Sequence, residues 1–221
     1  MAGCCRSGAC ERMFTARFAR RTLRRYRKKG LDDVERELVG AALSEGVEGA
    51  RVLEIGGGIG AIQAELLAAG AASGEIVELV PAYEQYAREL ASMLGLFGRT
   101  EFRVLDLLEE PEAVPPADVV VLNRVVCCSP DGVELTALAA RLARRLLLVS
   151  YPRDAWWVRA AVGLQNAGLR LLRRSFRVFV HPPDALAAAA GAAGLRLERR
   201  GGGAIWEYAV LQRPLELERT S

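Results

Sequence analysis

Residues 51–60 read RVLEIGGGIG, and this stretch decides the fold. Its first half, Arg51–Ile55, has the β-branched and apolar residues of a buried strand. Gly56, Gly58 and Gly60 follow where a helix is predicted to begin. Glycines at such a turn let the backbone approach a ligand closely, and they expose the amide groups of the helix N-terminus to it. The stretch therefore predicts an α/β fold with a ligand site at the carboxyl end of its first strand.

Beyond this turn the chain alternates short β-rich runs with helical stretches, which is typical of a largely parallel sheet. The predicted strands are Arg51–Ile55, Glu75–Leu79, Glu101–Leu105, Asp118–Leu122, Leu146–Tyr151, Leu195–Arg199 and Ile205–Gln212. The predicted helices between them are Ile62–Ala69, Tyr83–Leu94, Val133–Arg144, Trp156–Arg173 and Pro183–Ala193. Only Gly201-Gly202-Gly203 joins the last two strands, which suits a hairpin and is too short for a parallel crossover. We predict a Rossmann-like, seven-stranded, mostly parallel sheet that ends with an antiparallel last strand.

The chain has 221 residues, of which 51% are hydrophobic and 26% charged, so it can bury one full core. We predict a main domain at residues 46–221 and an N-terminal helical arm at residues 1–45. The arm holds a basic helix, Glu11–Lys29, and a second helix, Asp32–Ser44. Ten of the 30 Lys and Arg residues lie within residues 1–30 beside a single acidic residue. A lid over the site or a funnel for an anionic substrate is favoured over a nucleic-acid contact.

Two further features of the sequence limit the class of protein. No run of about 18 uncharged apolar residues occurs, and the N-terminus lacks the apolar segment of a secretory signal. The five cysteines are odd in number, and two adjacent pairs cannot each close a disulfide without strain. We therefore expect a cytoplasmic protein with no membrane partner and no structural disulfides. Its oligomeric state is left open.

Polar side chains end three successive predicted strands after the glycine turn. Glu78 ends the second strand, where a carboxylate can accept both hydroxyl protons of a ribose. Asp106, followed by Leu107, ends the third strand and is placed to meet an adenine amine. Asn123 ends the fourth strand, at the sheet edge where such folds bind ligands. We expect these side chains to surround one adenosine-containing cofactor.

These motifs resemble those of the class I S-adenosylmethionine-dependent methyltransferases. The resembling segments are VLEIGGGIG (Val52–Gly60), VELVPAYEQYAREL (Val77–Leu90), VLDLLE (Val104–Glu109) and ADVVVLNRVVCCSPD (Ala117–Asp131). YRKKGLD (Tyr26–Asp32), the Cys-Cys pair and FVHPP (Phe179–Pro183) are similar to small-molecule O-methyltransferases of the magnesium-protoporphyrin type. The sequence departs from the family pattern at Asn123, where an Asp is common.

The resemblance implies S-adenosyl-L-methionine as the cofactor and assigns a part of it to each motif. Glu54, Gly56, Gly58 and Gly60 are expected near the methionine portion. The remaining expected contacts are Glu78 with the ribose, Asp106 and Leu107 with the adenine, and Asn123 with the methionine or the acceptor.

Few side chains are candidates for a general base. His181 is the only histidine, so it alone has an ordinary pKa that suits a base near neutral pH. Tyr151, at the end of the fifth strand, and Tyr26, near the end of the basic helix, could border the mouth of the site. For each of these three residues a purely structural role is the alternative.

The cysteines suggest a second kind of site. Cys4, Cys5 and Cys10 lie in the arm, and Cys127 and Cys128 follow the fourth strand. If they converged, their thiolates would bind zinc or another soft metal, or a soft metalloid substrate. Adjacent cysteines do not easily bind one ion, however, so small buried side chains at 127–128 are favoured and no metal is assigned.

The sequence thus predicts a methyltransferase that uses S-adenosylmethionine and transfers a methyl group in line to a small molecule. The acceptor is expected to be apolar or aromatic, because the insert after the fifth strand contains Trp156, Trp157, Phe176 and Phe179. An RNA methyltransferase, a nicotinamide-dependent reductase and a metal-sensing or non-catalytic S-adenosylmethionine-binding protein remain alternatives. The antiparallel last strand disfavours the reductase.

Overall fold

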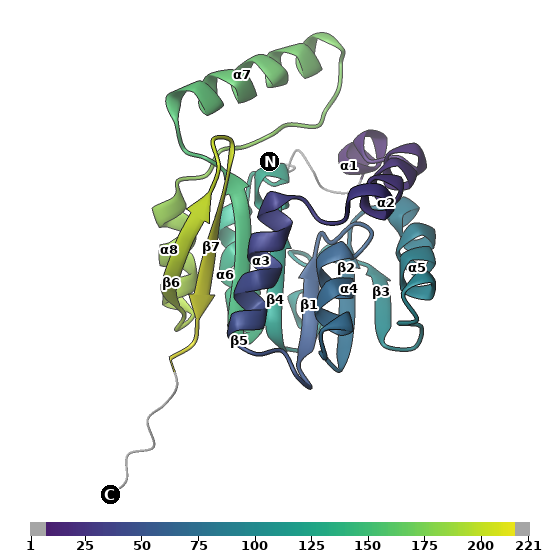
Figure 1. The fold of residues 1–221 in the computed structure, drawn as a ribbon. Coiled ribbons are helices and arrows are strands. Elements are labelled where there is room, and N and C mark those ends of the chain that lie inside the picture. The colour runs from purple at the N-terminus through teal and green to yellow at the C-terminus, as the bar shows by residue number, and fades with distance from the viewer. Residues whose placement is uncertain (1–7, 215–221) are drawn as a thin grey trace, which may run out of the picture.

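The buried strand Arg51–Ile55, β1, lies inside a seven-stranded sheet in the computed structural model, which describes residues 8–214 (Figure 1). The strand order is β3-β2-β1-β4-β5-β7-β6. The other strands are β2 (Ser73–Glu78), β3 (Thr100–Val104), β4 (Ala117–Asn123), β5 (Ala143–Pro152), β6 (Arg196–Gly202) and β7 (Trp206–Gln212). All neighbours from β3 to β5 pair in parallel, whereas β7 is antiparallel to both β5 and β6. The predicted Rossmann-like fold with an antiparallel last strand is confirmed.

One detail of the sheet prediction was wrong, because the antiparallel strand does not end the sheet. β7 lies between β5 and β6, and β6 forms the edge. The burial of the two strands explains this order. Four consecutive residues of β7 are buried, Tyr208–Leu211, whereas β6 is a charged strand, RLERRGG, with almost every residue exposed. A strand of that composition is suited to a solvent-facing edge.

Helices cover both faces of the sheet (Figure 1). One face carries α3 (Asp33–Ser44), α4 (Ala61–Ala68) and α5 (Glu84–Met93), and the other carries α6 (Gly132–Leu142) and α8 (Pro183–Ala192). Alternate residues of β4 supply the two cores, Val119 and Val121 on the first face, and Val120 and Leu122 on the second. A strand buried on both faces needs a continuous apolar run, which VVVL provides.

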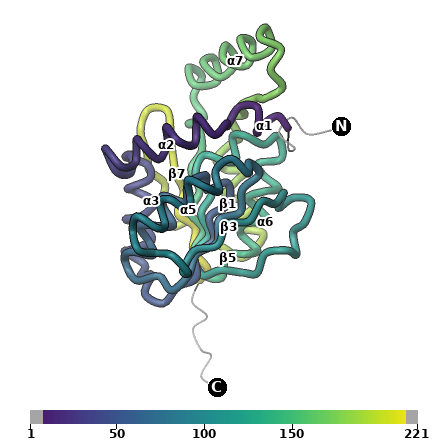
Figure 2. The backbone as a smooth tube through the Cα atoms, turned by 90° about the vertical axis from the view of Figure 1, so that its right-hand side faces the viewer, coloured from purple at the N-terminus to yellow at the C-terminus, as the bar shows by residue number. Residues whose placement is uncertain are grey.

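The predicted basic helix Glu11–Lys29 is two helices, α1 (Gly8–Met13) and α2 (Ala16–Lys29). The break lies at Phe14 and Thr15, where the Phe14 ring packs edge-on against Phe176 at a centroid distance of 5.3 Å. Near the other end of α2, the Tyr26 hydroxyl donates a hydrogen bond of 2.7 Å to Glu65 Oε1 on α4. These contacts hold α2 across one end of the molecule (Figure 2).

The other helix of the N-terminal arm, α3, packs on a face of the sheet. α3 packs against α4 and against β5 and β7, so it covers the sheet itself. Asp32 caps α3, accepting a hydrogen bond from Glu35 N at 3.1 Å while Glu35 Oε2 accepts one from Asp32 N at 2.8 Å. Within the described part of the arm, α1 and α2 lie over the end of the sheet where the strands finish, and α3 contributes Glu35 there from its first turn.

The sixteen-residue helix α7 (Trp156–Leu171) lies apart from both helical layers and projects from the end of the molecule that also carries α1 and α2 (Figures 1 and 2). Three short 3-10 turns complete the secondary structure of the described chain: η1 (Pro81–Tyr83), η2 (Pro111–Ala113) and η3 (Val126–Cys128). No helix within residues 8–214 combines the length and apolar character that crossing a bilayer requires.

Candidate functional site

A cavity of about 810 Å³ lies where the carboxyl ends of β1, β2 and β4 meet α1 and α2. We call it the sheet-edge cavity. Its volume is within the range of small-molecule sites. Most of the residues predicted to bind a cofactor line this cavity: Glu54, Gly56, Gly58, Glu78, Asp106, Leu107 and Asn123.

The glycine turn after β1 requires glycine at three positions. Gly56, Gly58 and Gly60 have φ angles of +64°, +58° and +72°, in the left-handed region. A Cβ atom at Gly56 would lie 2.4 Å from Val125 Cγ2. Gly60 is not among the residues that line the cavity; it precedes α4, and its carbonyl accepts a hydrogen bond from the backbone of Ala64. Its contribution is to the turn and the start of the helix.

Glu54, near the end of β1, is a buried acid in the wall of the cavity. Its side chain is 2% exposed, and Oε2 accepts a hydrogen bond of 3.0 Å from Gln63 N. Burial, together with the neighbouring carboxylates of Glu35 and Glu78, raises the pKa of Glu54 to about 8, although the Gln63 amide opposes the rise. A cationic partner would stabilise the charged form of this buried carboxyl group and so lower its pKa again.

This raised pKa predicts a pH dependence of stability. The free energy of unfolding is expected to fall as pH rises from about 4.5 to about 8, because the carboxyl group of Glu54 ionises in the unfolded chain but keeps its proton in the folded one. Glu54→Gln removes this ionisation and keeps an acceptor for the Gln63 amide. Urea denaturation of the ligand-free protein is expected to show the variant gaining ~4 kcal/mol relative to the wild type between pH 5 and pH 9. Parallel pH profiles for the two proteins would contradict the assignment.

Glu78 closes the end of β2 against the glycine turn. Oε2 accepts a hydrogen bond from Gly58 N at 3.0 Å, and Oε1 accepts one from Val80 N at 3.1 Å. Burial raises the pKa of Glu78, and the backbone amides of Gly58 and Val80 oppose that rise. Asp106, beyond β3, is organised in a similar way, since its Oδ1 accepts from Leu108 N at 3.1 Å. Both carboxyl groups are thus fixed by local backbone and reach the same cavity.

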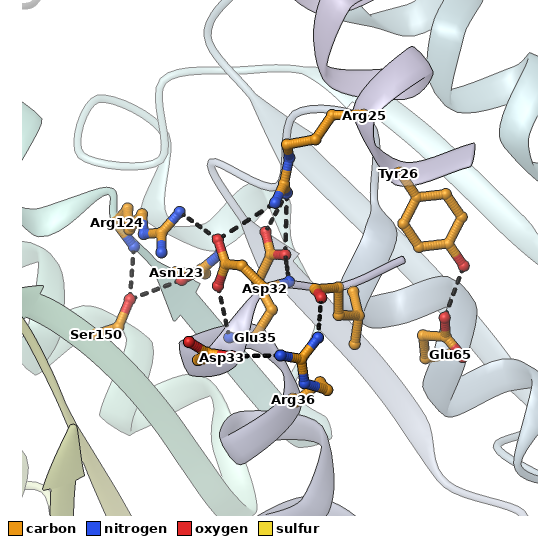
Figure 3. A network of polar contacts seen from close by, with 11 residues as sticks. Arg25, Tyr26, Asp32, Asp33, Glu35, Arg36, Glu65, Asn123, Arg124 and Ser150 are labelled. Atoms are coloured by element: carbon orange, nitrogen blue, oxygen red, sulfur yellow. Dashed lines mark hydrogen bonds and ion pairs between the residues drawn. The ribbon is translucent and has the colours of Figure 1, made fainter. Parts of the chain in front are cut away.

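A polar network joins α2 and α3 to the carboxyl end of β4 (Figure 3). Asp32 Oδ2 lies 2.7 Å from Arg124 Nη1 and 3.5 Å from Arg25 Nη1. Arg25 Nη2 also reaches Glu35 Oε2 at 3.1 Å. Arg124 follows β4 with an unusual positive φ of 57°, and its guanidinium lies 4.8 Å from the centre of the Trp206 ring. The network fixes α2 at the sheet edge and neutralises both arginines.

The network continues from Arg124 into the sheet (Figure 3). Ser150 Oγ on β5 accepts a hydrogen bond of 2.9 Å from Arg124 N and donates one of 2.7 Å to Asn123 Oδ1. Asn123 therefore has a fixed orientation at the position where the family pattern favours an Asp. Its side-chain oxygen is occupied by a neighbour, and Asn123 still lines the cavity.

Sequence reasoning proposed the basic helix as a lid or a funnel, but it did not identify which residues of α2 line the cavity. Arg21 and Lys29 line the cavity, and neither forms an ion pair with another residue in the described part of the chain. We call them the cationic pair. Phe14 and Phe18 line the same wall. The signal was the spacing of Arg21, Arg25 and Lys29 every four residues, which places them along one helix face.

The three predicted catalytic side chains do not line the cavity. His181 is 9% exposed, and its Nε2 lies 3.0 Å from the Val126 carbonyl and 2.9 Å from the Ser129 carbonyl. Because both partners are acceptors, Nε2 carries the proton and serves as a donor. His181 therefore ties its segment to the loop after β4 and is not placed to act as a base.

Tyr151 and Tyr26 are also structural. Tyr151 belongs to the core under α6 and α8, is 1% exposed, and has a pKa raised to about 12 by burial. Burial likewise raises the pKa of Tyr26, whose hydroxyl is engaged by Glu65. Neither residue borders the cavity, which corrects the sequence-based expectation.

The described cysteines do not form a metal site. No group of three or more His, Cys, Asp or Glu side chains within residues 8–214 could hold an ion. Cys10 and Cys128 line the cavity, whereas Cys127 is buried with its Sγ 3.3 Å from the Arg124 carbonyl. Cys4 and Cys5 lie outside the described residues.

Comparison with solved structures places this fold among known enzymes. The magnesium protoporphyrin IX methyltransferase of Synechocystis PCC 6803 with bound S-adenosylhomocysteine superposes with a TM-score of 0.72 and 18% identity, over 92% of this chain and 98% of that one. An O-methyltransferase family 2 protein from Planctomyces limnophilus, in complex with apigenin, gives a TM-score of 0.64 and 19% identity, over 89% and 62% of the two chains. The fold is that of S-adenosylmethionine-dependent methyltransferases.

The methyltransferase fold does not by itself decide the activity. The cyclase SpnF superposes with a TM-score of 0.61 and 11% identity, over 82% of this chain and 80% of that one. One architecture thus supports different reactions, so function has to be argued from the site. No protein-family model and no curated protein sequence matches the chain.

Proposed function

We propose that the protein is an S-adenosylmethionine-dependent methyltransferase that acts on a small molecule. One observation carries the proposal: Glu54, Glu78 and Asn123, near the ends of β1, β2 and β4, and Asp106, in the segment after β3, line one cavity beside the glycine turn. The resident group that the fold implies fits these residues. Acids at the end of β2 and after β3 suit the ribose and the adenine amine, and Gly56 and Gly58 place no side chain of their own in the turn.

In this proposal each lining residue holds one part of the cofactor. Gly56 and Gly58 lie close to the methionine portion, and Glu54 orients its amino end through nearby amides or water. Glu78 holds the ribose hydroxyls, Asp106 accepts from the adenine amine, and Leu107 packs against the ring. Asn123, held by Ser150, contacts the methionine or the acceptor.

When bound, the cofactor supplies a methyl group that its sulfonium already activates. The chain then has to hold the acceptor in line with that methyl and keep water away, and orientation of this kind can provide most of the rate enhancement. α1 and α2 serve this purpose, because Cys10, Phe14 and Phe18 cover the cavity. A carboxylate or thiolate acceptor needs no general base, which agrees with the structural role of His181.

The acceptor proposed here has an apolar or aromatic body and an anionic group. Phe14, Phe18 and Leu135 provide apolar wall, and the cationic pair, Arg21 and Lys29, provides positive charge that is engaged in no ion pair within the described residues. An anion beside such cations gains charge-assisted hydrogen bonds. Small aromatic carboxylic acids are therefore the first acceptors to test.

The test is a methyl-transfer assay with isotopically labelled S-adenosylmethionine and a panel of aromatic carboxylic acids, with their neutral amides added as competing ligands. Arg21→Gln/Lys29→Gln is expected to raise KM for the acids about 10–100-fold, the value of hydrogen bonds to charged groups, and to leave the inhibition by the amides little changed. Arg20→Gln/Lys28→Gln is the matched control, because these residues line the outer groove of α2 and not the cavity. Equal effects of the two double variants would refute the role of the cationic pair.

A further inference from the structure

Helix α7 exposes an unusual amount of apolar surface. Trp156 and Leu164 are each 77% exposed, Leu171 is 85% exposed and Leu172 is 71% exposed. Val158 is the one buried residue of this helix. Large apolar side chains gathered on one element at such exposure mark a contact surface.

Exposed residues occur around most of α7, and one line of them along the helix carries no charge. The exposed stripe consists of Trp157, Ala161, Leu164, Gly168 and Leu171, which are separated by alternating steps of four and three residues, and all five are exposed. Such spacing places residues on one side of a helix.

The other side of α7 is held by the protein. The Asn166 side chain donates to the Val178 carbonyl at 2.8 Å and accepts from Val178 N at 2.9 Å. Leu169 packs against the core beneath. These contacts fix the rotation of the helix, so the exposed stripe is presented outward in a defined orientation.

The charge around the exposed stripe has one sign. Residues 155–183 contain five arginines and no Asp or Glu. Arg159 pairs with Asp154, whereas the exposed side chains of Arg170, Arg173 and Arg174 form no ion pair within the described chain. The basic helix α2 lies at the same end of the molecule in both views (Figures 1 and 2).

We propose that α7 binds the surface of an anionic lipid bilayer, with its exposed stripe inserted among the headgroups and its arginines paired with lipid phosphates. A helix with an exposed tryptophan in an uncharged stripe, and with arginines as its only charges, has the composition for this role. A second copy of the chain fits less well, because stripe-to-stripe contact would bring two sets of unpaired arginines together without acidic partners. The sequence-based expectation of no membrane partner rested on the absence of a spanning segment, which a surface-bound helix does not need.

The test measures sedimentation of the full-length protein with vesicles of phosphatidylcholine, alone or with added phosphatidylglycerol. The wild type is expected to bind the anionic vesicles at least about tenfold more strongly than the neutral ones, since each arginine near an anionic surface adds attraction. Leu164→Asp/Leu171→Asp and, separately, Arg170→Gln/Arg173→Gln/Arg174→Gln are each expected to lower that binding at least about tenfold. All of these residues are exposed, so the variants are expected to melt like the wild type.

Phe97→Asp is the matched control, because Phe97 is 83% exposed before β3, at the amino-terminal edge of the sheet, far from α7. This variant is expected to bind vesicles like the wild type. Absence of wild-type binding to anionic vesicles, or an equal loss in Phe97→Asp, would overturn the proposal. Analytical ultracentrifugation tests the alternative partner, a second copy of the chain. If the wild type does not bind vesicles but forms a dimer, and Leu164→Asp/Leu171→Asp dissociates that dimer, the exposed stripe binds a second copy and the bilayer proposal is wrong. The experiment needs no cofactor, so its outcome is independent of the proposed methyl transfer.

Discussion

Replacing Glu78 by Ala is expected to weaken S-adenosylmethionine binding by roughly 1–3 kcal/mol, which is about 5–150-fold in Kd. The carboxyl group lines the cavity at the end of β2, where the proposal places the two ribose hydroxyls. Its removal leaves those hydroxyls without an acceptor in a site that is largely closed to water. Calorimetric titration of wild type and variant measures the difference.

Two controls separate this effect from damage to the turn. Glu78 also accepts hydrogen bonds from Gly58 N and Val80 N, so Glu78→Gln, which keeps an acceptor, is compared with Glu78→Ala by thermal melting. Glu112→Ala removes an exposed acid in η2 and is expected to bind the cofactor like the wild type. Unchanged affinity in both Glu78 variants would remove the ribose assignment.

Replacing Gly56 by Ala is expected to have the largest effect on the protein as a whole. The φ of +64° costs an alanine about 1–2 kcal/mol, and the new Cβ would lie 2.4 Å from Val125 Cγ2. Relief of that overlap by movement of the turn costs about 1–3 kcal/mol more. We expect a loss of about 2–5 kcal/mol in urea denaturation, together with loss of cofactor binding, since the turn forms the floor of the cavity.

Gly95→Ala is the comparison for this prediction. Gly95 has a similar φ of +68°, and no atom lies within 4 Å of the place where its Cβ would stand. Its substitution therefore measures the backbone cost alone. Gly56→Ala/Val125→Ala removes the overlap, and this double variant is expected to recover part of the free energy of unfolding that Gly56→Ala loses beyond Gly95→Ala. Equal losses in Gly56→Ala and Gly95→Ala would show that close packing against Val125 contributes nothing.

The sheet and most of the lining residues could be predicted because both follow from local patterns. Apolar runs such as VVVL in β4 fit only a strand buried on both faces. Parallel strands bring their carboxyl ends to one edge, so Glu54, Glu78 and Asp106 had to approach each other once their strands were assigned. The position of β7 was not predictable in this way, because a hairpin specifies pairing with β6 and leaves open which strand joins the rest of the sheet.

The contribution of α2 depends on long-range contacts that no local pattern contains. Which face of this helix covers the cavity is decided by Tyr26 reaching Glu65 and by Arg25 reaching Asp32 and Glu35. His181 was judged on its chemistry, yet its partners are two backbone carbonyls far away in sequence. The exposed stripe of α7 was hidden for the same reason, since an apolar helix in a sequence is normally assigned to the core.

The central claim is that the sheet-edge cavity binds S-adenosylmethionine. The most direct measurement is calorimetric titration of the purified wild-type protein with S-adenosylmethionine, S-adenosylhomocysteine and NADH in parallel. The account predicts binding of the first two in the micromolar range, lost in Gly56→Ala, and no binding of NADH. Binding of NADH alone would make the protein a nicotinamide-dependent enzyme and contradict the account, and the absence of binding by all three compounds would contradict it as well.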